Sequence, residues 1–158
     1  MKKITLVPVM AFLLCALVAP VSAQHDVHTA SDGQWFPITL TGVAEAPGPG
    51  DPDGAGTATL TLDADAGMIC VDAAYADIAL PVTGAHIHEA PLGVGGSIVV
   101  PFIGGGGSVS QATTEAFSGC ADVEAGLLHA IGANPANYYL NLHNAEFPAG
   151  AIRGQLAE

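Results

Sequence analysis

The sequence has very few basic side chains. Its 158 residues include three Lys and Arg against 15 Asp and Glu. Two of the three are Lys2 and Lys3, which leaves Arg153 alone in the rest of the chain. Such a surface repels phosphate backbones and anionic headgroups, so we expect no nucleic acid and no anionic membrane as a partner. A metal ion or an extracellular protein fits better, although acidity can also serve only to keep an exported protein soluble.

Long apolar runs are also missing, except at the start of the chain. Lys2 and Lys3 precede an apolar stretch over residues 4–19, which ends at Pro20 and the small residues before Gln24. The stretch is too short for a membrane-spanning helix and has the pattern of a secretory signal peptide. We predict a signal peptide over residues 1–23, no membrane span after cleavage, and a secreted or periplasmic location.

Cysteine is scarce, and its spacing excludes one class of site. One of the three cysteines, Cys15, lies in the predicted signal peptide, which leaves Cys70 and Cys120. Neither belongs to a short Cys-x-x-Cys pair, so a cysteine metal site is disfavoured. An even number of cysteines in an exported protein favours one disulfide between them, with two buried free thiols as the alternative.

Helical periodicity is confined to one segment, residues 123–131, with Asp122 as its expected N-cap and Gly132 as its end. The rest alternates in short apolar and polar runs between Gly- and Pro-rich turns, which indicates β-strands. We therefore predict an all-β, antiparallel, Greek-key-like β-sandwich with one short helix over residues 35–158. Residues 24–34 are expected to form a flexible segment. The strands are expected at residues 35–41, 57–63, 68–76, 84–89, 97–102, 112–120, 137–143 and 151–156.

Three histidines are predicted to share one face of this sheet. His86 and His88 flank Ile87, so in a strand both imidazoles project to one side while Ile87 enters the core. His143 alternates in the same way with buried leucines. Arg153 is expected to turn outward from the last strand. If these strands are neighbours, three imidazoles and one guanidinium lie on a common surface. Two further histidines, His25 and His28, lie near the mature N-terminus and would bind metal only adventitiously.

Several blocks of the sequence resemble the CHRD domain, a module of secreted proteins. The resemblance covers almost the whole mature chain, and its last two blocks are specific. It implies a β-sandwich whose function is little known. The matching blocks lie at residues 42–45, 56–60, 85–91, 138–143 and 147–156.

The histidine motif is also similar to that of copper–zinc superoxide dismutase. That family carries a Gly-x-His-x-His-Glu strand, like residues 84–89 here, a later histidine like His143, and an arginine near the end like Arg153. The resemblance implies copper held by histidines and an arginine that attracts superoxide. The bridging histidine and the zinc ligands of that family have no counterpart here, so we expect at most a weak dismutase-like redox activity.

We therefore expect His86, His88 and His143 to bind a single copper ion, with zinc as the alternative metal. Arg153 would be an anion-attracting neighbour of the open coordination position. The competing hypothesis is a non-catalytic extracellular interaction or matrix module that binds no metal.

Overall fold

A computed structural model describes residues 33–157. The predicted signal peptide, its cleavage site, His25 and His28 lie outside these residues. The elements are β1 (Gln34–Thr41), η1 (Gly42–Ala44), β2 (Ala55–Asp63), β3 (Met68–Ala76), β4 (Gly84–Glu89), β5 (Ser97–Ile103), β6 (Ala116–Asp122), α1 (Ala125–Ala133), η2 (Pro135–Asn137), β7 (Tyr138–His143) and β8 (Ile152–Gln155).

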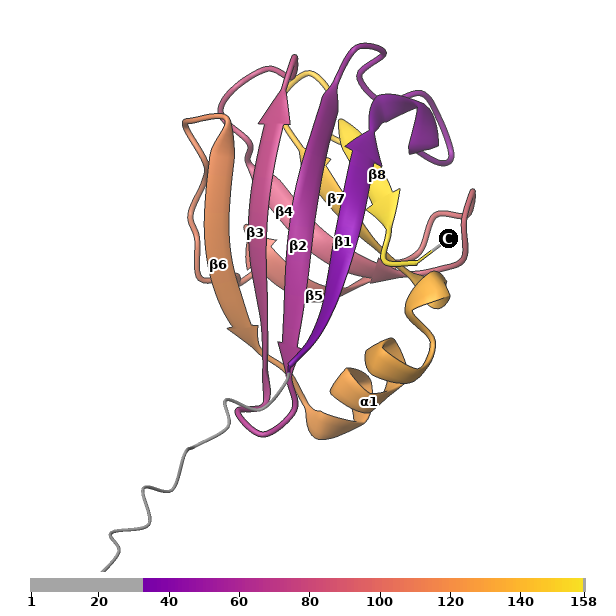
Figure 1. The fold of residues 1–158 in the computed structure, drawn as a ribbon. Coiled ribbons are helices and arrows are strands. Elements are labelled where there is room, and N and C mark those ends of the chain that lie inside the picture. Colours follow the sequence, from indigo (N-terminus) through magenta and orange to yellow (C-terminus); the bar gives the residue numbers. More distant parts are fainter. Residues whose placement is uncertain (1–32, 158) are drawn as a thin grey trace, which may run out of the picture.

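The eight strands form one antiparallel sheet in the order β5-β4-β7-β8-β1-β2-β3-β6. The sheet folds over on itself, so that β6, β3, β2 and β1 form one layer and β8, β7, β4 and β5 the other (Figure 1). A single register pair, Thr41 with Arg153, joins β1 to β8 between the two layers. The predicted all-β, sandwich-like fold with one short helix is confirmed.

The core is the space between the two layers. Alternate residues of each strand enter it, which is the period that the sequence pattern predicted. In β1–β3 the apolar half of each strand is buried while the threonines of β2 face solvent. In the second layer the inward residues of β4, β7 and β8 have no exposed surface at Ile87, Leu140, Leu142 and Ile152.

The helix begins later in the chain than predicted. Asp122 is the last residue of β6, where it pairs with Met68 of β3, and this ladder keeps its backbone extended. Glu124 therefore occupies the N-cap position of α1, and Gly132 lies inside the helix instead of ending it. Among residues 33–157 no helix is long and apolar enough to cross a membrane.

One strand is also displaced from its expected position. The prediction placed it at residues 112–120, whereas β6 runs from Ala116 to Asp122. Ala112 instead makes an isolated bridge with Val82, which ties this segment to the residues just before β4. The other strands lie within two residues of their expected bounds.

The predicted disulfide is confirmed. Cys70 of β3 and Cys120 of β6 are register partners on adjacent strands, with a Cα–Cα distance of 4.0 Å. The bond closes a loop with a sequence separation of 50 residues and ties the edge strand β6 to the sheet. It therefore restricts the unfolded chain most strongly around β4 and β5, which lie within that loop.

Replacing both cysteines, as Cys70→Ser with Cys120→Ser, is expected to lower the free energy of unfolding by about 2–4 kcal/mol, because the open chain gains conformational entropy. Urea denaturation of the mature protein, with and without a reductant, measures the loss. The double variant should be insensitive to the reductant. Equal stability of the two proteins under oxidising conditions would contradict the expectation.

Candidate metal centre

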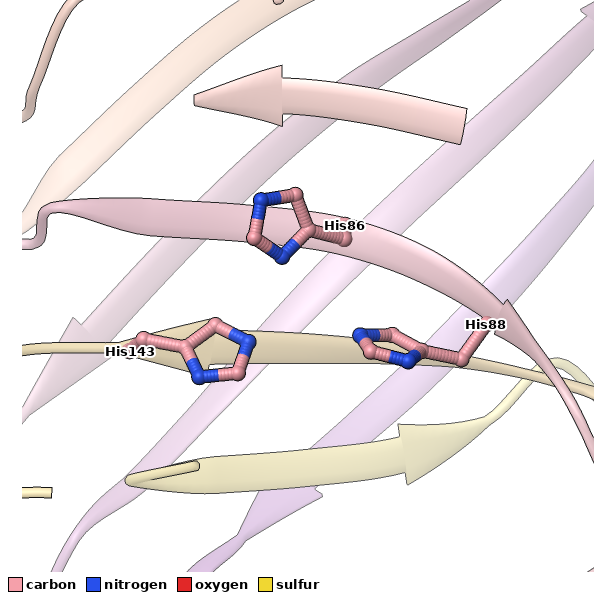
Figure 2. A group of neighbouring side chains, drawn as sticks. All are labelled: His86, His88 and His143. Carbon is pink, nitrogen blue, oxygen red and sulfur yellow. The ribbon is translucent and has the colours of Figure 1, made fainter. Parts of the chain in front are cut away.

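The register between β4 and β7 brings the three histidines together. The two strands are antiparallel, with His86 opposite Asn141, His88 opposite Tyr139, and Gly84 opposite His143. Alternation places all of these side chains on the outer face of the layer, away from Ile87 in the core. The three imidazole rings converge above this face (Figure 2). The structure thus brings together all three histidines that the alternation of the sequence predicted to share a face.

Gly84 makes room for this convergence. A Cβ atom at Gly84 would lie 3.1 Å from Cδ2 of His143 and 3.1 Å from Cε1 of His86. Because glycine has no side chain, the His143 ring can lie over Gly84, its register partner on β4, and approach the ring of His86. The centroids of these two rings are 5.1 Å apart, which is the shortest separation among the three rings.

One nitrogen of each ring is buried without a hydrogen-bond partner. These atoms are Nδ1 of His86, Nε2 of His88 and Nε2 of His143. One potential ligand atom from each of the three histidines lies within 4.8 Å of the others. No other group of three or more such ligands converges within the described residues 33–157. Three unpaired imidazole nitrogens at one place are the donor set expected of a metal site.

The second nitrogen of two rings contacts a backbone carbonyl. Nδ1 of His88 lies 3.0 Å from the oxygen of Gly96, and Nδ1 of His143 lies 3.2 Å from the oxygen of Pro148. A carbonyl oxygen only accepts, so each Nδ1 carries the proton and each Nε2 is left with its lone pair. This outer hydrogen bond is the usual way in which proteins fix the tautomer of a metal-binding histidine.

Burial lowers the pKa of all three imidazoles. For His86 the pKa falls from 6.5 to about 4, mainly through burial and further through the neighbouring His143 and His88. Burial also lowers the pKa of His88 and of His143, against the opposing effect of their backbone hydrogen bonds. The rings are therefore neutral at pH 7, which is the form that coordinates a metal.

The spacing of the nitrogens fits a metal after a small adjustment. Two nitrogens bonded to one ion at about 2.0–2.1 Å lie at most about 4.2 Å apart. Nitrogens separated by up to 4.8 Å must therefore draw together by at least about half an ångström on binding. Rotation about the side-chain bonds supplies such a shift. The three histidines could therefore hold copper or zinc with a further position left for another ligand.

A pocket of about 320 Å³ gives access to the histidines. It opens beside the rings of His86 and His143. The side chain of Asn144 also lines the pocket, but it is already hydrogen-bonded to the backbone of Ala79, Glu146 and Phe147. The pocket therefore admits a small ion or molecule without offering it a charged partner. It is lined by Thr83, Gly84, His86, Ile98, His143, Asn144 and Pro148.

The structure places Arg153 on the predicted face but buries its side chain. Its side chain lies on the same face as the histidines but has no exposed surface, because the loop of residues 90–96 covers it. Its Nη1 donates to the carbonyl of Val94 at 2.8 Å and its Nη2 to that of Pro91 at 3.2 Å. The predicted face of Arg153 was correct, but alternation gives only the face of a residue and not what covers that face.

Tyr139 separates Arg153 from the histidines. The guanidinium carbon of Arg153 lies 3.4 Å from the centre of the Tyr139 ring, and the His88 ring is stacked on Tyr139 with a centroid distance of 4.8 Å. Because β7 lies between β4 and β8 in the sheet, the Tyr139 ring lies between His88 of β4 and Arg153 of β8. The positive charge of Arg153 nevertheless reaches His88, since it contributes, after burial, to the lowered pKa of that imidazole.

Glu45 and Asn141 form a polar contact on the same face that the sequence analysis missed. Nδ2 of Asn141 donates to Oε2 of Glu45 at 3.1 Å, and burial raises the pKa of Glu45 to about 7 in spite of nearby Arg153. Oε1 of Glu45, Oδ1 of Asn141 and Nε of Arg153 are buried without partners. Asn141 lies two residues before His143 on the same face of β7, but no local signal pointed to Glu45, which lies 96 residues away.

Comparison with known proteins gives one family. The model of the CHRD domain matches residues 36–156, which is most of the chain. No curated protein and no solved structure matches the sequence. The family match includes β4, β7 and β8, and thus all three histidines of the candidate site.

The lowered pKa of His86 predicts a pH dependence of stability. Between pH 6.5 and about 4 the unfolded chain takes up a proton at His86 that the folded chain does not, so the free energy of unfolding falls as the pH falls through this range. We expect the metal-free protein to lose about 1–2 kcal/mol more than His86→Asn between pH 7 and pH 5. Urea denaturation with a chelator present measures both, and identical losses would contradict the assignment.

Proposed function

We propose that this chain, which belongs to the CHRD domain family, is an exported protein that binds a single copper ion through His86, His88 and His143. The observation that carries the proposal is the convergence of three neutral imidazoles, each with one buried nitrogen that has no partner. A buried polar atom without a partner is costly, and a bound metal would satisfy all three at once.

Copper is favoured over zinc by the chemistry of the ligands. All three donors are imidazoles, which suit both metals, and a site of given donors holds Cu²⁺ more tightly than Zn²⁺. Zinc remains the alternative where copper is scarce. The strongly acidic composition of the chain raises the local concentration of any divalent cation, which helps both metals equally.

The disulfide supports a secreted or periplasmic location. Disulfides persist in oxidising compartments, and the start of the chain has the pattern of a signal peptide. In such a compartment free copper and zinc reach the protein from outside the cell. The proposed location and the proposed ligand are therefore consistent with each other.

The site favours binding of the metal over rapid chemistry on an anion. Arg153 is the only Lys or Arg among residues 33–157, and it is covered by the 90–96 loop. The described surface therefore offers no Lys or Arg to steer an anion such as superoxide toward the metal. We propose that any dismutase-like activity is weak, and that the chain holds metal as its main role.

The ligand set predicts the effect of three single substitutions. We expect the wild type to bind one Cu²⁺, and His86→Ala, His88→Ala and His143→Ala each to weaken binding by more than the 10–100-fold that loss of an outer hydrogen-bond partner typically costs. Competition titration with a chromogenic chelator measures the affinity. The chain should start near Ser31, so that His25 and His28 do not contribute.

His129→Ala is the matched control, because His129 is exposed on α1 and is not part of the convergent group. It should bind copper like the wild type. If the wild type binds no copper, or if all of these variants bind alike, the metal site does not exist. The non-catalytic interaction module without metal then becomes the better account of the domain.

A further inference from the structure

We propose that Arg153 is a positioning residue, which holds the 90–96 loop so that the Gly96 carbonyl fixes the orientation and the tautomer of His88. This inference rests on the proposed metal site and assigns to Arg153 a role other than attracting an anion. The link from Arg153 to His88 has three steps, from Arg153 to the loop, from the loop to His88, and from the loop to Tyr139.

The first step is the attachment of the loop to β8. Arg153 donates from separate nitrogens to the carbonyls of Val94 and Pro91, and Gln155 donates to the carbonyl of Ala90 at 2.8 Å. Two side chains of β8 thus hold three backbone carbonyls of the connection between β4 and β5. Both side chains are more than nine-tenths buried, so water does not compete strongly for these bonds.

The second step is the contact between the end of the loop and His88. The carbonyl of Gly96 accepts from Nδ1 of His88 at 3.0 Å, which leaves Nε2 free for a metal. Gly96 can occupy this place only because it has no side chain, since a Cβ atom there would collide with the carbonyl of Glu89. A loop released from β8 would withdraw this carbonyl, and His88 would then exchange between its two tautomers.

The third step adds a second route through Tyr139. The N–H of Gly96 donates to the hydroxyl of Tyr139 at 3.0 Å, so the same glycine is held from both sides of its backbone. The Tyr139 ring in turn lies between the guanidinium of Arg153 and the ring of His88. Arg153 therefore supports His88 both through the loop and through the face of an aromatic ring.

The planar guanidinium is the property that these contacts need. Its separate N–H groups reach two carbonyls at fixed angles while its flat face stacks on the Tyr139 ring. Lysine keeps the positive charge but has neither the fork nor the flat face. Arg153→Lys therefore separates a role in positioning from a role of the charge alone.

The tautomer of His88 in the metal-free protein is the direct test. Long-range ¹H–¹⁵N correlation spectra, recorded where the imidazoles are neutral, should show His88 protonated on Nδ1 alone in the wild type. In Arg153→Lys we expect both tautomers, together with an affinity for Zn²⁺ that falls by about 10–100-fold. Zn²⁺ is the probe because it does not broaden the spectra.

Tyr75→Phe is the matched control, since the buried Tyr75 side chain also ties down a loop, through a part-buried hydrogen bond to the carbonyl of Thr114 beside the other layer, and has no contact with the site. It should change neither the tautomer of His88 nor the zinc affinity. If Arg153→Lys does not fold, Arg153→Gln takes its place, because its shorter planar amide cannot hold both carbonyls of the loop, and it is expected to give both tautomers. A single Nδ1-protonated form in the folded variant tested would overturn the inference.

The two proposals fail in different ways. A wild type that binds no Zn²⁺ or Cu²⁺ while His88 stays in one tautomer would contradict the metal site and leave the positioning role intact. Zinc binding that is unchanged in Arg153→Lys, with His88 in one tautomer, would leave the metal site intact and contradict the positioning role.

Discussion

The antiparallel pairing of β4 with β7 is the constraint on which the candidate site depends. His88 opposite Tyr139 and His86 opposite Asn141 place two histidines beside the strand that carries His143. A slip of one residue would send every side chain of β4 to the other face, and the histidines would enter the core. Ile87 and Leu140, which are partners in the same ladder and fully buried, oppose that slip. The apolar core therefore fixes the geometry of the three histidines.

Two ionisable side chains, Arg153 and Glu45, are shielded from water near the histidines. This burial has a free-energy cost that the rest of the fold must offset. Arg153 carries a charge away from water, and it is stabilised by carbonyl groups and an aromatic ring without a carboxylate in contact. Glu45 stands nearby with a raised pKa, so its negative charge is also disfavoured by burial. Such a network adds little to stability compared with an apolar one. Because the network lies beside three unpaired imidazoles, a role in the candidate site accounts for it better than a contribution to the stability of the fold.

The sequence was enough to predict the fold class, the disulfide and the common face of the three histidines, because these follow from alternation along the strands and from the number of cysteines. The surroundings of Arg153 could not be predicted in this way. Alternation placed it on the correct face, but the loop that covers it is turn-rich and gives no signal of its position. The start of α1 was misplaced for a similar reason, because Asp122 is a good N-cap in isolation and its pairing with Met68 is a long-range contact. Glu45 was missed because its partner Asn141 is distant in the chain.

X-ray absorption spectroscopy of the copper-loaded mature chain, starting near Ser31, tests the central claim most directly, because scattering from imidazole rings reveals how many histidines hold the ion. The account predicts one copper per chain with three imidazole ligands, and two in the His143→Ala protein if it still retains the metal. Coordination by fewer than three imidazoles in the wild type, or a copper environment that is the same in His143→Ala, would contradict the assignment of His86, His88 and His143 as a metal centre.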